Sequence, residues 1–280
     1  EVNQNMPKAL GYETELNLCD VDYVVEGSNH PMPQIPNRAG TPVDDKIADY
    51  IIPMIEDGST LQLGIGGIPS AVGRKLAESD VQDLSGHTEM LVDSYVDLYE
   101  AGKITGNKNR DKGKIIYAFA GGRQGLYDLS YVNNVGVVAS IDKFISINGC
   151  IDLDLYGQVN AETAGYQQIS GTGGQLDFAQ GAFASNGGKS FICVHSTRKF
   201  KDGHVESLIK PTLPAGTVIT TPRSAVHYIV TEYGTALLKG KSTWERAEAL
   251  INIAHPDFRE ELIKDAEKMG IWTKTSKISM

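Results

Sequence analysis

The sequence predicts an α/β protein built around an open β-sheet that binds its ligand along one edge. Helix-like and strand-like segments alternate from residue 41 onward, a succession typical of this class. Three glycine-rich loops also lie at the ends of predicted strands, at 64–67, 171–174 and 187–188. Open α/β sheets bind ligands in crevices at the carboxyl ends of their strands, so these loops are candidates for a binding site.

The first elements are predicted from capping residues and helix breakers. A helix begins at Thr41–Pro42, because threonine can cap a helix and proline suits its first turn. Pro53 should kink this helix, and Asp57–Gly58 should end it. A strand over 60–63 follows, and a second helix is expected over 69–78.

The later elements continue the alternation. Asn148–Gly149 lies between two alternating apolar segments, 144–147 and 151–155, and therefore predicts a β-hairpin. Ser242 and Glu245 have the spacing of a capping box, which predicts the start of a helix. Further strands are expected over 114–120, 190–194, 217–220 and 228–231, and further helices over 126–132 and 256–270.

Composition and charge narrow the class of protein. A net charge of −9 and a pI near 5.2 argue against nucleic acid or an anionic membrane as the partner. Three cysteines without metal-like spacing indicate a reducing, cytoplasmic environment. No apolar run in the sequence approaches a membrane span, and no spacing of His, Cys, Asp and Glu predicts a metal site.

Residues 1–40 do not have the pattern of a complete unit. The segment 22–26 is apolar enough for one more strand, and the prolines within 27–40 predict an extended linker. We therefore expect 1–40 to be the tail of a preceding N-terminal domain plus a linker, and 41–280 to be a C-terminal domain. The first residue, Glu1, is not Met, so we expect the chain to come from a longer protein.

The first glycine turn has two interpretations. A bare backbone and a helix N-terminus meet at Gly64, Gly66 and Gly67, which suits an anion or a polarised carbonyl group. The spacing is G-x-G-G, however, and it matches neither the dinucleotide fingerprint nor a Walker loop. A plain structural bend is the alternative, and the turn alone leaves both interpretations open.

Glu89 is the strongest candidate for chemistry. It follows Gly86, which permits an unusual backbone, and it precedes the apolar segment 90–92, which would anchor it in a core. A buried carboxylate can act as a base or a nucleophile, whereas a surface position is the commoner fate of a glutamate. His87 is more simply explained as a structural histidine than as a ligand.

Taken together, these motifs resemble the acetyl-CoA hydrolase/transferase family, and within it the butyryl-CoA:acetate and 4-hydroxybutyrate CoA-transferases. Each motif is weak alone, but their combination is specific and covers nearly the whole chain in order. Thr88 stands where relatives often have serine, a change that keeps a hydroxyl group. The matching segments are 63–69, 87–90, 154–160, 168–178, 230–234 and 250–256.

The resemblance implies a fold and a set of site residues. The fold would be an open three-layer α/β/α sheet of the CoA-transferase type, also called NagB/RpiA/CoA-transferase-like. Glu89 would be the glutamate nucleophile, and 121–127 could help to shape the acyl pocket. The residues implied to contact CoA are Gly64, Ile65, Gly66, Gly67, Ile68, Gly171, Gly173, Gly174, Gly187, Gly188 and Lys189.

The resemblance also implies an activity. The protein would be a CoA-transferase of short-chain fatty acid and butyrate metabolism, moving CoA between a short-chain acyl-CoA, with butyryl-CoA favoured, and acetate. The reaction would be ping-pong through a glutamyl–CoA thioester, with coenzyme A or acyl-CoA as substrate and no permanently bound cofactor. The alternatives are a 4-hydroxybutyrate CoA-transferase, an acyl-CoA hydrolase using the same glutamate, or a CoA-binding fragment without activity. A homo-oligomer is implied as well.

Overall fold

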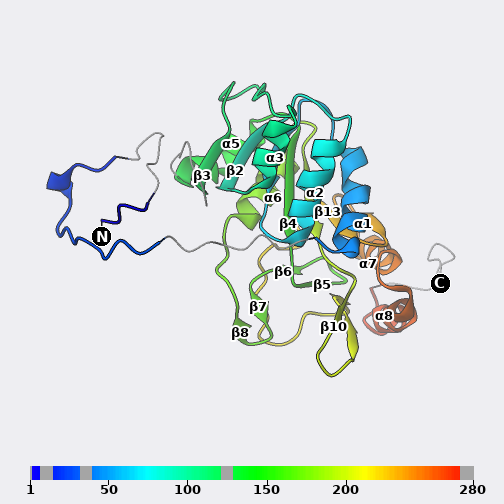
Figure 1. Ribbon diagram of the computed structural model, residues 1–280. Coiled ribbons are helices and arrows are strands. Elements are labelled where there is room, and N and C mark those ends of the chain that lie inside the picture. The colour runs from blue at the N-terminus through cyan, green and yellow to red at the C-terminus, as the bar shows by residue number, and fades with distance from the viewer. Residues whose placement is uncertain (1, 7–14, 32–39, 121–128, 272–280) are drawn as a thin grey trace.

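A computed structural model describes residues 2–6, 15–31, 40–120 and 129–271 of the chain, and within them one large sheet organises the fold (Figure 1). Its strand order is β14-β13-β9-β4-β1-β2-β3. All neighbours pair in parallel except β13 and β14, which are antiparallel. The strands are β1 (Thr60–Leu63), β2 (Ser85–Leu91), β3 (Ile116–Ala120), β4 (Phe144–Gly149), β9 (Lys189–Cys193), β13 (Tyr228–Thr231) and β14 (Gly234–Leu237).

Helices cover both faces of this sheet, which confirms the predicted α/β/α layers (Figure 1). One apolar cluster joins one face to α1 (Pro42–Ile51), α2 (Gly67–Glu78) and α3 (Ser94–Glu100). Two further clusters lie on the opposite face. They involve α4 (Leu129–Val132), α5 (Val135–Ala139), α6 (Gln175–Ala184), α7 (Thr243–Asn252) and α8 (Pro256–Lys268).

Side chains alternate between the two faces along each strand, as the pleat requires. Leu61 and Leu63 of β1 pack toward α1 and α2. Phe144 of β4 packs instead against Phe178 of α6, with ring centroids 6.2 Å apart. Even-numbered residues of β1 and β4 therefore point toward the α6 face, and this alternation decides which side chains meet at the carboxyl edge.

The order of the strands reverses between β1 and β4. The chain builds outward from β1 through β2 to β3, and then returns to place β4 on the other side of β1. A reversal of this kind leaves a crevice at the carboxyl ends of the two central strands, because their connections leave in opposite directions. The fold therefore predicts a ligand site at the ends of β1 and β4.

The N-terminal cap of α1 is confirmed, and its end is corrected. Thr41 and Asp44 form a capping box around the first turn. The α-helix ends at Ile51, and a short 3₁₀ turn, Ile52–Met54, replaces the predicted kinked helix that would have reached Asp57–Gly58. Pro53 explains the difference, because it lacks an N–H and its ring crowds the preceding turn.

The predicted hairpin at Asn148–Gly149 is wrong. β4 lies between β1 and β9 in the parallel sheet, whereas β5 (Asp152–Asp154) pairs in a separate small sheet with β6 (Val159–Asn160) and β12 (Ile209–Lys210). The segments 22–26 and 217–220 do not form strands either. Local alternation cannot distinguish a hairpin from two strands whose partners come from distant parts of the chain.

The remaining elements agree better with the sequence. The Ser242–Glu245 capping box starts α7, and α8 begins at Pro256 and ends before Gly270, whose φ is +67°. Outside the large sheet lie two small hairpins, β7 (Thr163–Ala164) with β8 (Gln167–Gln168) and β10 (Thr197–Lys199) with β11 (Val205–Ser207), and a 3₁₀ turn, Leu18–Asp20. Among the described residues, no helix has both the length and the apolar character needed to cross a membrane.

Candidate active site

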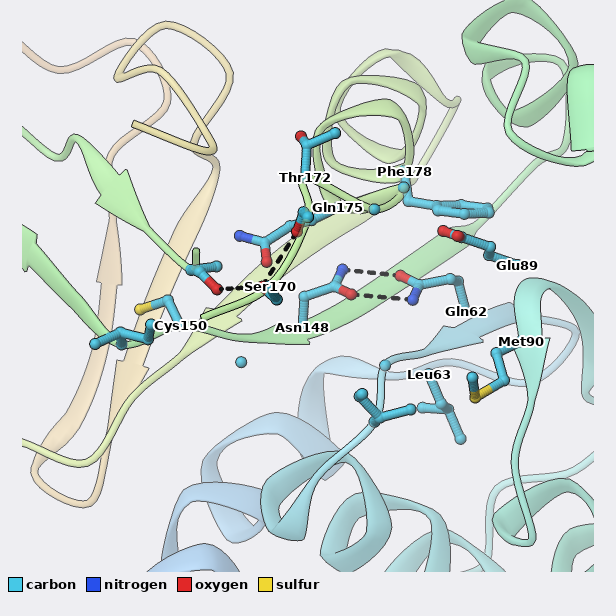
Figure 2. Close-up of a pocket in the computed structure, with 18 of the residues that line it drawn as sticks. Gln62, Leu63, Glu89, Met90, Asn148, Cys150, Ser170, Thr172, Gln175 and Phe178 are labelled. Atoms are coloured by element: carbon cyan, nitrogen blue, oxygen red, sulfur yellow. Dashed lines mark hydrogen bonds between the residues drawn. The ribbon is translucent and has the colours of Figure 1, made fainter. Parts of the chain in front are cut away.

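A cavity of about 420 Å³ opens at the carboxyl edge of the sheet, at the reversal between β1 and β4 (Figure 2). Its walls come from the segment after β1, the end of β2, the segment after β4, and the loop that precedes α6. Among the described residues that line it, Glu89 is the only one with a charged side chain. The structure therefore brings the predicted glutamate to the site that the topology predicts.

The Glu89 carboxylate is held by contacts to one of its two oxygens. Nδ2 of Asn133 donates a hydrogen bond to Oε2 at 3.2 Å. Gly174, at the N-cap of α6, leaves room for both groups, since a Cβ there would overlap Oε2 of Glu89 and Nδ2 of Asn133. The partial positive charge at the N-terminus of α6 favours an anion at this position. Within the described chain, Oε1 has no hydrogen-bond donor, so it is the oxygen available for chemistry.

Asn133 was not identified from the sequence. It follows α4, and its Oδ1 atom is buried without a hydrogen-bond partner among the described residues. Buried polar atoms are seldom left unpaired without a functional reason. Because Nδ2 is directed toward Glu89, Oδ1 is left without a partner among the described residues, and Asn133 becomes a candidate site residue.

Asp177 lies in the first turn of α6, close enough to sense the charge of Glu89. Burial raises the pKa of the Asp177 carboxyl group, and repulsion from Glu89 raises it further. The N-terminal end of α6 thus faces two carboxyl groups, of which only Glu89 lines the cavity.

His87 has a structural role, as the sequence suggested. The ring is fully buried and its Nε2 bonds to the carbonyl oxygen of Val132 at 2.8 Å. Burial lowers the pKa of His87 to about 4, so the ring is neutral near pH 7. Its edge-on contact with Phe144, at 5.9 Å, places it and therefore Glu89, two residues later, on the α6 face of the sheet.

Gly86 is required for packing rather than for an unusual backbone, which corrects the prediction. Its φ is not positive, but a Cβ there would lie 2.8 Å from Ile115 and 3.0 Å from the Tyr95 ring. The Tyr95 ring packs against Gly86. Its hydroxyl donates a hydrogen bond to the Leu61 carbonyl oxygen at 2.8 Å and accepts one from the Leu63 N–H at 3.2 Å. Tyr95 thereby fills the place where β1 and β2 stop pairing.

Two residues of the glycine turn, Gly64 and Ile65, line the cavity. The backbone of this part of the turn is therefore beside Glu89, as expected. A Cβ on Gly64 would lie 3.0 Å from Oδ1 of Asn148, so the bare backbone also allows the Asn148 amide to lie against the turn.

The rest of the turn does not line the cavity. Gly66 adopts a φ of +119°, which only glycine adopts easily, and Ile68 is buried in the core. Gly67 starts α2 two residues earlier than predicted, and a Cβ on it would lie 2.8 Å from Oδ2 of Asp44. The buried carboxylate of Asp44 therefore lies at the N-terminus of α2, where the sequence predicted a bound ligand group. It also forms a hydrogen bond with Nε2 of His195 at 2.7 Å.

The two later glycine loops have different locations. Gly171, Gly173 and Gly174 line the cavity together with Glu89, and their contact with CoA stays a prediction. The segment Gly187–Lys189 instead enters β9 at its amino end, on the opposite edge of the sheet, where Lys189 pairs with Glu56 at 3.1 Å. A loop that precedes a strand lies at the amino end of that strand, whereas Glu89 lies at the carboxyl ends of the parallel strands. The structure therefore does not bring Gly187, Gly188 and Lys189 to Glu89.

Three buried polar side chains of β1 and β4 form a second feature that the sequence did not indicate. Oε1 of Gln62 accepts hydrogen bonds from Oγ of Ser146 and from Nδ2 of Asn148, both at 2.9 Å. Nε2 of Gln62 donates to Oδ1 of Asn148 at 3.1 Å. Gln62 and Asn148 line the cavity, and the only local sign of this network was a glutamine between two leucines in a buried strand.

Apolar side chains form much of the remaining wall. Leu63 and Met90 line the cavity on the α2 side, Phe178 lines it on the α6 side, and Phe119 stands at the rim with 41% of its surface exposed. Met90 and Phe119 are paired across β2 and β3. The predicted acyl-pocket segment 121–127 lies outside the described residues. No group of three His, Cys, Asp or Glu side chains in the described ranges is arranged to hold a metal ion.

A crevice at the reversal point of an open, mostly parallel sheet is the usual place of ligand binding in α/β proteins. A model of the acetyl-CoA hydrolase/transferase C-terminal domain matches residues 118–266, more than half of the chain. The chain belongs to the acetyl-CoA hydrolase/transferase family.

The relatives agree with this assignment. A butyryl-CoA:acetate CoA-transferase of Anaerostipes caccae is 53% identical over 99% of this chain and 66% of its own length. A 4-hydroxybutyrate coenzyme A transferase of Clostridium kluyveri is 45% identical, over 96% of this chain and 64% of its own length. The chain thus spans just under two thirds of these relatives.

Solved structures show the same fold. RipA from Yersinia pestis superposes with a TM-score of 0.86 at 38% identity, covering 96% of this chain and 62% of that one. A 4-hydroxybutyrate CoA-transferase from Porphyromonas gingivalis gives 0.77 at 34% identity, covering 95% and 65%. The predicted CoA-transferase type of α/β/α sheet is therefore confirmed.

Proposed function

We propose that this chain carries the catalytic glutamate of a CoA-transferase that moves CoA between a short-chain acyl-CoA, with butyryl-CoA favoured, and acetate. The observation that carries the proposal is the position of Glu89, the only charged side chain in the described wall of the cavity, held through Oε2 and open at Oε1. The names of the similar transferases support the substrate class. We also infer that residues 41–280 are the C-terminal domain and that 1–40 are the tail and linker of a preceding one.

The reaction that we propose proceeds in two matched halves. Oε1 of Glu89 attacks the thioester carbonyl carbon, the C–S bond breaks, and CoA leaves as a thiolate from an acyl–glutamyl anhydride. The thiolate then attacks the Glu89 carboxyl carbon, the bond from that carbon to the bridging Oε1 breaks, and the first acid leaves as a carboxylate that carries Oε1. Acetate reverses these steps on the glutamyl–CoA thioester. The thioester energy is retained throughout, so the balance needs no nucleotide.

The wall of the cavity supports these steps electrostatically. Each tetrahedral intermediate carries an oxyanion, and the backbone at Gly64, Ile65 and Gly174 lies beside Glu89. A preorganised donor of this kind is worth about 3–4 kcal/mol in the transition state where one has been removed. Leu63, Met90 and Phe178 keep the surroundings apolar, which raises the reactivity of a carboxylate that water would otherwise solvate.

Trapping of the covalent intermediate tests the proposal. Hydroxylamine or borohydride added with butyryl-CoA should modify the Glu89 peptide, as measured by mass spectrometry, and acyl-CoA should be required. Glu89→Gln should abolish labelling and lower transfer by about 10³-fold or more, because the amide is not a nucleophile. An active preparation whose Glu89 peptide stays unmodified would overturn the proposed role.

Hydrolysis with the same glutamate is the second candidate, because the family includes hydrolases as well as transferases. Thiol release from acyl-CoA that requires acetate indicates transfer, whereas equal release without acetate indicates hydrolysis. A panel of kcat/KM values for acetate, butyrate and 4-hydroxybutyrate decides the acid. CoA binding without turnover by this chain, together with turnover by a longer one, would indicate a binding fragment.

A further inference from the structure

We propose that Gln62 is a further catalytic residue. Its Nε2 would donate a hydrogen bond to the carbonyl oxygen of the acyl group that reacts with Glu89. The proposal rests on the proposed transferase function and adds to it a donor from a side chain. It follows from the hydrogen-bond inventory of Gln62, Asn148 and Ser146, and from the place of these residues in the cavity.

Gln62 has one N–H hydrogen to spare. A side-chain amide offers two hydrogens on nitrogen. Nε2 of Gln62 uses one of them for Oδ1 of Asn148, and within the described chain the other has no acceptor. Oε1 of Gln62 is fully used, because it accepts from both Ser146 and Asn148.

Asn148 has no hydrogen to spare. Its Nδ2 donates to Oε1 of Gln62 and to Oγ of Ser146, each at 2.9 Å. Ser146 donates its hydroxyl hydrogen to Gln62, which fixes the oxygen end of the Gln62 amide. The three side chains therefore form one oriented network, in which Gln62 alone among the three supplies a free donor.

The Gln62 side chain lies on the same side of the sheet as Glu89. The pairing of Leu61 with Gly86 places Gln62 next to His87 on the neighbouring strand. Residues 62, 87 and 89 point toward the α6 face, so Gln62 and Glu89 share that face at the carboxyl edge. Figure 2 shows the Gln62 amide between Asn148 and Glu89, and all three residues line the same cavity.

The burial of the network favours a ligand that supplies an acceptor for the unpaired N–H of Gln62. Gln62 is 4% exposed, Asn148 is 7% exposed and Ser146 is fully buried. Strand positions of this kind are usually apolar in parallel sheets, and buried donors are usually paired. An oxygen of a bound substrate would pair the remaining N–H of Gln62 at the place where the cavity opens.

A neutral donor suits this chemistry better than a cation would. A lysine or arginine beside Glu89 would pair with the carboxylate and reduce its nucleophilicity. An amide N–H costs the nucleophile little, but its hydrogen bond strengthens when the acyl oxygen becomes an oxyanion. In the proposed reaction this oxygen becomes an oxyanion when Glu89 attacks acyl-CoA, and again in the reverse half when the CoA thiolate attacks the acyl carbonyl carbon of the anhydride.

Ping-pong kinetics give the test, because they report kcat/KM separately for acyl-CoA and for the acid. Gln62→Met keeps the shape of the side chain and removes the donor, and it should lower both values by a similar factor of about 10². Gln158→Met is the matched control. Gln158 is half-buried and donates to Asp154 at 2.7 Å outside the cavity, so its loss should leave both values unchanged per folded molecule.

Two further variants distinguish loss of the hydrogen-bond donor from misfolding. Ser146→Ala retains Gln62 but removes the bond that orients it, and should lower both values by about tenfold with an unchanged KM for acyl-CoA. Gln62→Glu places an acceptor where the donor was and should lose at least as much as Gln62→Met. Thermal unfolding and circular dichroism of each variant, in the longest natural form of the protein, confirm the folded fraction.

Three results would overturn the proposal. Unchanged kinetics of Gln62→Met would show that the donor is not used. A fall confined to acyl-CoA would show that Gln62 meets the pantetheine arm and not the reacting oxygen. Activity retained in Gln62→Glu would show that the cavity needs an acceptor. In each case, labelling of Glu89 in the unaltered protein shows whether the transferase function itself still stands.

Discussion

Nδ2 of Asn133 lies 3.2 Å from Oε2 of Glu89, although 44 positions separate the two residues in the sequence. This hydrogen bond joins the catalytic candidate on β2 to the loop after α4. In the proposed reaction Oε2 stays on the glutamyl carbonyl group after Oε1 has attacked, so the same N–H would face the oxyanion of the second step.

Removal of this contact should therefore affect turnover more than binding. Asn133→Ala is expected to lower kcat by about 10²-fold, with a KM for acyl-CoA that changes little, because the bond acts mainly when charge develops on Oε2. Steady-state kinetics measure the split. A rise in KM with an unchanged kcat would show that Asn133 serves binding alone.

Gly174 should tolerate no side chain. A Cβ at this position overlaps both Glu89 and Asn133, so Gly174→Ala should displace the carboxylate and lower kcat by about 10²-fold, with a modest loss of stability of about 1–3 kcal/mol. Gly40→Ala is the control, since its Cβ would make only ordinary contacts beyond 3.7 Å. Equal activity of the two variants would contradict the close approach of Gly174 to the carboxylate.

The charge of Glu89 should be visible at Asp177. Repulsion from Glu89 is one of the two causes that raise the pKa of Asp177, and burial is the larger. Glu89→Gln should therefore lower the Asp177 pKa part of the way toward its ordinary value, because burial remains. A carbon-detected NMR titration of the carboxyl group measures this shift, and an unchanged pKa would place the two groups too far apart to interact.

The buried neutral ring of His87 should make stability depend on pH. Because its native pKa is about 4 and the ordinary value is 6.5, the unfolded chain binds the proton more readily than the native chain. The stability due to the neutral ring is complete above pH 6.5 and is lost as the pH falls toward 4, by up to about 3 kcal/mol. Urea unfolding of the wild type and of His87→Phe at several pH values isolates this slope, and parallel curves would refute it.

Part of this protein could be predicted from short stretches of sequence. The capping boxes at Thr41 and Ser242 start helices as expected, and the strand at 60–63 leads into a glycine turn. Glu89 and the loop around Gly174 were identified beforehand, and the structure brings them to one cavity. These features depend on residues close together in the chain, whose preferences for caps, turns and strands are local.

Only the tertiary structure decided which residues surround Glu89. Gln62 bonds to Asn148 across 86 positions, and Gly187–Lys189 lies at the far edge of the sheet although its composition resembles that of a ligand loop. The strand order sets these neighbours, and burial of apolar faces between distant segments sets the strand order. A local pattern shows that a strand exists, but the edge at which its loop lies follows from the direction of that strand in the sheet.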